Sequence, residues 1–152
     1  MKTLTLEPLT VPGTLASLSP IGNYVMKVAA AAGIDKSAAY RLRLAVDEIA
    51  TNCIVHGYDE AGLEGMVYLG GSIDDETLTV YVEDTAMPYD PRQTPAPDDL
   101  DVPLEQRDIG GLGVFLALRG VDQFLYEHSE GRNRSIFIMN RTSTSDGKPK
   151  SG

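Results

Sequence analysis

The chain has 152 residues and a formal net charge of −9, from 22 acidic and 13 basic residues. Its length suggests one domain, and its 42% hydrophobic residues suffice for a packed core without a disulfide or a metal. The acidic balance argues against duplex nucleic acid or an anionic membrane as the main partner, because both require a basic face. The single cysteine, Cys53, excludes an internal disulfide and a multi-cysteine metal site.

No apolar run approaches the roughly 18 residues of a membrane span. The N-terminal sequence MKTLTLEPLT lacks the apolar segment of a signal peptide. We therefore expect a cytoplasmic protein.

The N-terminal part predicts a short edge strand over residues 2–6, closed by Pro8 and Pro12, because Leu and Thr alternate there. A first helix follows, with Ser19 as its N-cap and Pro20 in its first position, and it ends at Gly33.

A second helix begins after Asp35 as N-cap and runs to about Val55, where His-Gly-Tyr at residues 56–58 breaks it. Its apolar stripe is formed by Leu42, Val46, Ile49 and Cys53.

The rest of the chain predicts two hairpins separated by a long proline-containing segment and a short helix. Residues 85–110 have no clear periodicity, and a loop of that length in a compact domain is either functional or disordered. The predicted strands are Met66–Ser72, Thr77–Asp84, Gln123–His128 and Ser135–Asn140, with turns at 74–75 and 130–133 and a helix from Gly110 to about Arg119.

This order of elements predicts an α+β fold of two layers, in which a mixed, mostly antiparallel sheet carries its helices on one face. The polar tail at residues 142–152 is expected to be disordered.

The second helix carries the first candidate site residues. Glu48 and Asn52 lie about 40° apart around the helix axis, at the edge of the apolar stripe, so both can point into one cleft. A carboxylate can act as a general base, and an amide oxygen suits Mg²⁺. The spacing alone favours a solvated helix edge, because such pairs are common.

Asp84 is the second candidate, because strand periodicity places it on the same face as Leu78, Val80 and Val82. It therefore ends a buried row, where a carboxylate can accept a hydrogen bond from an exocyclic amine such as that of adenine. Alternatively, Asp84 caps the turn into the following loop. The sequence leaves these two interpretations equal.

The third candidate is the glycine cluster Gly110, Gly111 and Gly113 at the start of a predicted helix. Backbone N–H groups at a helix N-terminus bind phosphate, and glycine allows close approach. The pattern is not a P-loop, and a plain hinge is the alternative.

Taken together, these motifs resemble those of the GHKL ATP-binding superfamily, and most of all its branch of small anti-sigma-factor serine kinases. The segment LAVDEIATNCIVHGY (44–58) resembles the family's N-box, and VEDTAMPYDP (82–91) resembles its Asp-x-Gly box. The segment from Gly110 to Arg141 resembles the second glycine box, its helix and the closing hairpin.

The resemblance implies a role for each matching residue. Glu48 corresponds to the proposed base, Asn52 to the Mg²⁺ ligand and Asp84 to the adenine-binding aspartate. Residues 85–110 correspond to the ATP lid of a domain spanning 1–141. The remaining implied nucleotide contacts are Ala86, Arg107, Gly110, Gly111, Leu112 and Gly113, with ATP and Mg²⁺ as ligands.

The implied activity is phosphorylation of a serine or threonine on a small antagonist protein, combined with sequestration of a sigma factor. A homodimer is also implied. Two features depart from the family pattern: Ala86 replaces the glycine of the Asp-x-Gly box, and the lid is acidic and rich in proline. Arg107 either reaches a γ-phosphate or pairs with lid carboxylates.

Two other functions remain open at this point. One is a partner-binding module with weak or no nucleotide binding, which the Ala86 departure favours. The other is the detached ATP-binding half of a histidine kinase. The sequence lacks a dimerisation helix pair with a phosphoacceptor histidine, which argues against this function.

Overall fold

The structure is a computed structural model that describes residues 3–88, 90–91, 114 and 116–141. Its first elements are β1 (Leu4–Thr5), β2 (Leu9–Pro12), a 3₁₀ turn (Leu15–Ser17) and α1 (Leu18–Ala31). They are followed by α2 (Lys36–Asn52), a π-helix (Cys53–Asp59), β3 (Met66–Ile73) and β4 (Thr77–Asp84). The last elements are β5 (Gln123–Ser129) and β6 (Arg132–Asn140), preceded by a helical turn at residues 116–118.

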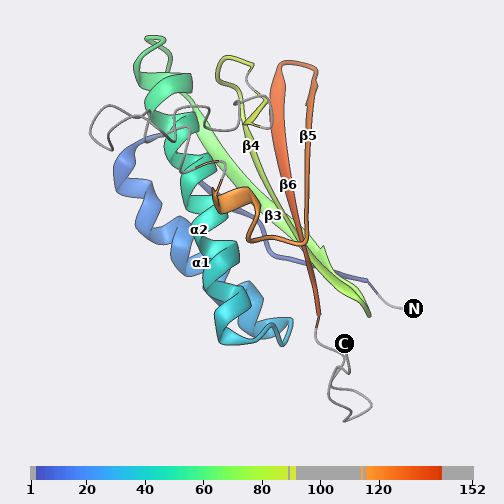
Figure 1. The fold of residues 1–152 in the computed structure, drawn as a ribbon. Coiled ribbons are helices and arrows are strands. Elements are labelled where there is room, and N and C mark those ends of the chain that lie inside the picture. The colour runs from blue at the N-terminus through green and yellow to red at the C-terminus, as the bar shows by residue number, and fades with distance from the viewer. Residues whose placement is uncertain (1–2, 89, 92–113, 115, 142–152) are drawn as a thin grey trace, which may run out of the picture.

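The strands form one six-stranded sheet in the order β1-β3-β4-β6-β5, with β2 also paired to β3. Each pairing among the described strands is antiparallel. Helices α1 and α2 lie side by side on one face of this sheet (Figure 1). The predicted α+β class, two layers and mostly antiparallel sheet are therefore confirmed.

The core lies between the helices and the inner face of the sheet. Along β4, Leu78, Val80 and Val82 are buried, as strand periodicity predicted. They meet the apolar stripe of α2, in which Leu42 and Val46 are fully buried. Burial of apolar surface contributes about 25 cal/mol per Å² to the free energy of folding, so this helix–sheet contact is the main source of stability.

The N-terminal region differs from the prediction. The predicted strand shortens to Leu4–Thr5, and the chain forms a second strand, β2, that ends on Pro12. Proline is tolerated there because β2 lies at an edge of the sheet. Ser19 is not the N-cap, since α1 begins at Leu18 and Pro20 is its third residue, where its missing N–H is not needed.

The second helix begins as predicted, because the Asp35 carboxylate accepts the Ala38 N–H at 2.8 Å. Its end does not match the prediction. Instead of stopping at His56, the backbone continues as a π-helix to Asp59. Short π-helical segments are often associated with functional sites.

Both predicted hairpins are present. The first joins β3 and β4, and the Asp74 carboxylate caps its turn by accepting the N–H groups of Glu76 and Thr77. The second turns over Glu130 and Gly131 alone, so β6 begins at Arg132 instead of Ser135. The glycines at 110–113, Arg107 and the tail from 142 lie outside the described residues.

Candidate functional site

The Asp84 carboxylate is the centre of the candidate site. It lies at the end of β4, and the residue is only 7% exposed. Its Oδ1 accepts the Ala86 N–H at 2.9 Å and an N–H of the Asn133 side chain at 2.8 Å. The first contact makes the turn cap that the sequence offered as one interpretation of Asp84. The second satisfies a carboxylate that would be costly to bury without a partner.

Asn133 is a residue of the candidate site that the sequence did not indicate, because a turn was predicted over residues 130–133. In the structure it lies directly opposite Asp84 in the β4–β6 ladder and is 5% exposed. Strand alternation could have indicated its position. If β6 is paired with β4 from Arg132 onward, alternate residues of β6 face the core, and Asn133 is one of them.

Cys53 connects the helix layer to Asp84. Cys53 lies close to Asp84: burial, followed by the charge of the Asp84 carboxylate, raises the pKa of the Cys53 thiol far above its ordinary value. Because Cys53 directly follows Asn52, this proximity brings the C-terminal end of α2 close to the end of β4. Its predicted place beside the core is confirmed, since it packs partly buried against the apolar cluster.

Glu48 and Asn52 are both partly exposed on α2, one helical turn apart. Burial, with a smaller contribution from the neighbouring charge of Asp47, raises the pKa of Glu48. A raised carboxyl pKa moves the group toward the range in which it can accept and release a proton. Their roles as base and Mg²⁺ ligand stay predictions.

Tyr58, at the end of the π-helix, holds the turn that follows Asp84. Its hydroxyl accepts the Thr85 N–H at 3.0 Å and donates to the Met66 carbonyl at 2.8 Å. The ring is 1% exposed and packs close to Gly13 and Gly65. The π-helix thus anchors the segment that leads from the sheet into residues 85–91.

Ala86 fits this turn without strain. Among the described residues, positive φ occurs outside glycine only at Glu130, so the backbone of Ala86 does not need glycine. Ala86 is 5% exposed, and a Cβ added to Gly57 would lie 2.7 Å from its methyl group. The methyl group therefore faces the π-helix backbone.

Among the described residues, no group of three or more histidine, cysteine, aspartate or glutamate side chains is placed to hold a metal ion. Asn52 supplies one oxygen, which suits a Mg²⁺ ion that is held mainly by phosphates and water. Gly110, Gly111, Leu112, Gly113 and Arg107 lie outside this description.

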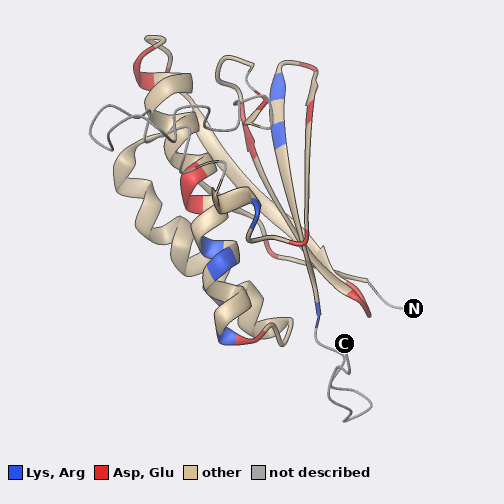
Figure 2. Cartoon of the chain, viewed as in Figure 1, with Lys and Arg blue, Asp and Glu red and all other residues tan. Residues whose placement is uncertain are grey.

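The outer face of the sheet carries a different polar cluster. Glu83 forms ion pairs with Arg132 and Arg134, and each arginine lies over a tyrosine ring, Tyr68 or Tyr81. Figure 2 shows the basic residues of β6 at the start of that strand, beside acidic residues at the end of β4.

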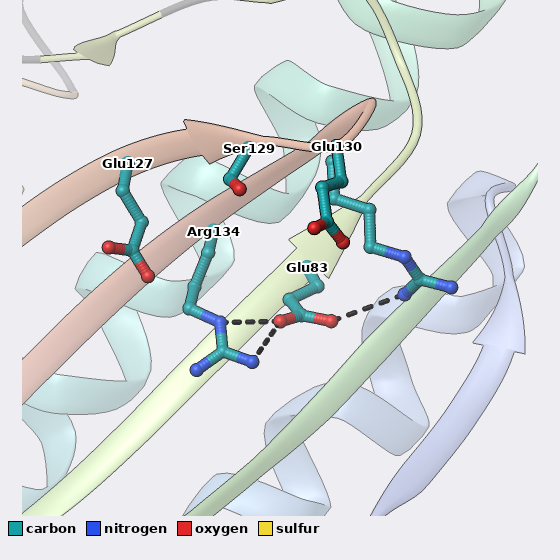
Figure 3. Close-up of a pocket in the computed structure, with 6 residues that line it drawn as sticks. Glu83, Glu127, Ser129, Glu130 and Arg134 are labelled. Carbon is teal, nitrogen blue, oxygen red and sulfur yellow. Dashed lines mark hydrogen bonds and ion pairs between the residues drawn. The ribbon is translucent and has the colours of Figure 1, made fainter.

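This cluster lines a cavity of about 460 Å³ together with Glu127, Ser129 and Glu130 (Figure 3). The arginines are already paired with Glu83, and the cavity lies on the face of the sheet opposite α2. We therefore assign the candidate site to Asp84 and not to this cavity.

The structure is a two-layer α+β domain in which the second helix carries a glutamate and an asparagine near its C-terminal end and one strand ends in a buried aspartate. The family model of the histidine kinase-like ATPase domain matches residues 11–139. The chain belongs to this family.

Several curated relatives are similar to this chain. A serine-protein kinase RsbW from Halalkalibacterium halodurans is 25% identical over 126 residues, covering 81% of this chain and 76% of the relative. The serine-protein kinase RsbW from Listeria monocytogenes is 32% identical over 109 residues, or 68% of each chain. That from Bacillus cereus strain AH187 is 27% identical over 113 residues, covering 71% and 69%.

Solved structures are also similar to this chain. One of them is the histidine kinase domain of a blue-light activated histidine kinase from Erythrobacter litoralis EL346, with 20% identity and a TM-score of 0.48. The match covers 83% of this chain and 63% of the solved one, so this chain spans less than two thirds of that domain. Within the part of the chain that the structure describes, no helix is both long and apolar enough to cross a bilayer.

Proposed function

We propose that this chain is an ATP-dependent serine/threonine protein kinase of the anti-sigma-factor type. The observation that supports the proposal is the proximity of Cys53 to Asp84, because Cys53 directly follows the helix that carries Glu48 and Asn52. The family match and the names of the RsbW relatives, at 25–32% identity, support the same activity.

In this proposal Asp84 accepts a hydrogen bond from the exocyclic amine of adenine. Asn52 holds Mg²⁺, which shields the phosphate charge when bound. Ala86, Arg107 and residues 110–113 complete the nucleotide site, and residues 85–110 form its lid. These assignments rest on the family resemblance together with the position of Asp84.

Glu48 accepts the proton of the substrate hydroxyl. The hydroxyl oxygen then forms a bond to the γ-phosphorus, and the bond from that phosphorus to the β,γ-bridging oxygen breaks, releasing ADP. Phosphoryl transfer depends mainly on positioning and charge neutralisation, so a small set of residues is sufficient. The raised pKa of Glu48 is consistent with this role.

The proposed substrate is a small antagonist protein with a serine or threonine at its acceptor site, and the proposed second partner is a sigma factor. The names of the RsbW relatives support the kinase part of this proposal. A cytoplasmic location and a homodimer belong to the same proposal.

A second candidate function is a partner-binding module without phosphoryl transfer. One observation favours it: Asp84 Oδ1 already accepts two N–H groups from within the chain, so the turn is complete without a ligand. In that case Asp84 and its hydrogen bonds only stabilise the fold and bind no nucleotide.

Calorimetry of ATP binding, with and without Mg²⁺, separates the two functions. We expect Mg²⁺-dependent binding that Asn52→Ala abolishes and that the matched control Asn23→Ala, on the exposed side of α1, leaves unchanged. Absence of ATP binding by the wild type would contradict the kinase proposal and leave the binding module.

Phosphoryl transfer is then measured with radiolabelled ATP and a small sheet-and-helix protein encoded beside this chain, with a serine at a helix start. Glu48→Gln should reduce the rate by about 10²–10⁴-fold, the usual contribution of a general base. Glu64→Gln, at an exposed position outside the site, should leave it unchanged. An unchanged rate in Glu48→Gln would remove Glu48 from the mechanism.

A further inference from the structure

Asn133 is a hydrogen-bonding centre between three strands. Its Nδ2 donates to Asp84 Oδ1 at 2.8 Å, to the Ala86 carbonyl at 3.1 Å and to the Met87 carbonyl at 3.2 Å. Its Oδ1 accepts the hydroxyl of Tyr126, which lies on β5. Strands β4, β6 and β5 run side by side (Figure 1), so these contacts join the three strands at one end of the sheet.

The surroundings fix which way the Asn133 amide points. Three oxygen acceptors surround its nitrogen, and a phenolic O–H points at its oxygen. A flipped amide would place its oxygen against the Asp84 carboxylate and two carbonyl groups, none of which can donate. Tyr126 therefore holds the amide in the orientation that donates to Asp84.

This arrangement also fixes the Asp84 carboxylate. Asn133 and the Ala86 N–H both donate to Oδ1, so rotation of the carboxylate would break two hydrogen bonds in a buried site. The lone pairs of the Asp84 carboxylate that these bonds leave unused therefore keep one fixed direction. A rigid, pre-oriented acceptor binds a ligand N–H with less loss of side-chain freedom than a mobile one does.

We propose that Tyr126 and Asn133 are positioning residues that set the base specificity of the nucleotide site, by fixing Asp84 as an acceptor for the 6-amino group of a purine. This inference rests on the proposed function, because it assigns the base to Asp84. Neither residue touches the nucleotide in this assignment; both act through the carboxylate.

The chemistry predicts which bases the site takes. A 6-amino group donates to the fixed carboxylate, whereas a 6-oxo group would place an oxygen against an acceptor that cannot turn away. Sites built around a buried hydrogen-bonding group reject ligands that leave the group unpaired. We therefore expect adenine nucleotides to bind and guanine or hypoxanthine nucleotides to be rejected.

The test compares ATP with purine riboside 5′-triphosphate, which lacks the 6-amino group. By calorimetry, wild type should bind ATP about tenfold more tightly than this analogue, the value of a hydrogen bond to a charged group. Tyr126→Phe and Asn133→Ala should weaken ATP binding by about 3- to 10-fold and change binding of the analogue by less than about twofold. The ratio of the two affinities, ATP over the analogue, should therefore be smaller in both variants than in wild type.

Tyr81→Phe is the matched control, because Tyr81 lies on the outer face of the sheet beneath Arg134 and should leave both affinities unchanged. An equal loss for both nucleotides in Tyr126→Phe would mean that the pair only supports the fold, and no loss for ATP would also overturn the inference. If Asn133→Ala fails to fold, as judged by its melting curve, Tyr126→Phe decides. Failure of wild type to bind either nucleotide would overturn the proposed function as well.

Discussion

Asn133 and Asp84 face each other across the β4–β6 ladder, and the amide of one donates to the carboxylate of the other at 2.8 Å. One position earlier on β4, Glu83 points to the opposite face and pairs with Arg132 and Arg134, the two neighbours of Asn133. The two strands are therefore joined by polar contacts on both faces. A slip of one residue would turn charged side chains toward the core.

The first prediction compares Glu83 and Asp84, two adjacent carboxylates on opposite faces of β4. Asp84→Asn should lower the free energy of unfolding by about 1–3 kcal/mol, because buried N–H donors lose their charged acceptor. It should also reduce ATP affinity at least about tenfold. Glu83→Gln makes the same chemical change on the outer face and should leave ATP affinity unchanged.

Urea unfolding and calorimetry of both variants check this prediction. Equal effects of the two substitutions on ATP affinity would show that the base does not contact Asp84.

The second prediction concerns the Ala86 departure from the family pattern. Because its backbone has ordinary φ and its methyl group is buried, Ala86→Gly should lower the free energy of unfolding by about 0.5–1 kcal/mol. ATP affinity should change by less than about fivefold, which corresponds to less than about 1 kcal/mol of binding free energy. A large gain in ATP affinity would instead show that the methyl group obstructs the nucleotide.

The third prediction uses the titration of Glu48. Its pKa is raised in the folded state, so the folded protein favours the protonated form. This contribution to stability is present below the unfolded-state pKa of a glutamate and is lost as pH rises through the higher folded pKa. At neutral pH, Glu48→Gln should therefore be at least as stable as wild type, while losing kinase activity.

Melting curves of wild type and Glu48→Gln from pH 4 to 8 measure the difference. The gain in melting temperature of Glu48→Gln over wild type should be largest at neutral pH and should disappear toward pH 4. A variant less stable than wild type at pH 7 would show that the charged form of Glu48 has a stabilising partner.

The fourth prediction concerns the Cys53 thiol, which is partly buried and lies close to the Asp84 carboxylate. Because its pKa is raised well above the ordinary range, it should stay protonated at pH 8, and the thiolate is the reactive form. A disulfide reagent such as DTNB should modify it at least about 100-fold more slowly in the folded protein than in urea. Equal rates would contradict the burial of the thiol and its raised pKa.

The fifth prediction contrasts two glycines with positive φ. Gly71 in β3 has φ 155°, and an added Cβ would lie 1.9 Å from the Thr79 carbonyl oxygen. Gly33 after α1 has φ 73° but open space around it. Gly71→Ala should cost more than about 3 kcal/mol, and Gly33→Ala about 1 kcal/mol. Similar urea midpoints for the two variants would contradict this difference.

Much of the fold followed from local patterns. The Asp35 cap, the apolar stripe of α2 and the alternation along β4 each depend on neighbours within a few residues, so the sequence predicted them correctly. The same alternation placed Asp84 at the end of a buried row. Strand β2 and the π-helix were missed because pairing with β3 and the Tyr58 anchor override the local signals of proline and glycine.

The candidate site was only partly predictable for the same reason. Glu48, Asn52 and Asp84 follow from periodicity and from the family resemblance, and the structure brings the end of α2 to Asp84 through Cys53. Asn133 depends on the register between strands that lie 49 residues apart in sequence, which local reasoning does not fix.

The contacts of Asp84 also have a consequence for folding kinetics. One donor, the Ala86 N–H, is local, but the other, Asn133, lies on β6, 49 residues further along the chain, so the contacts of the carboxylate are complete only when distant segments have met. Contacts of such long range form late, after the entropy of closing large loops has been overcome. A nucleotide bound at this carboxylate would recognise the native chain and not a partly folded one, and would therefore slow unfolding more than it speeds folding.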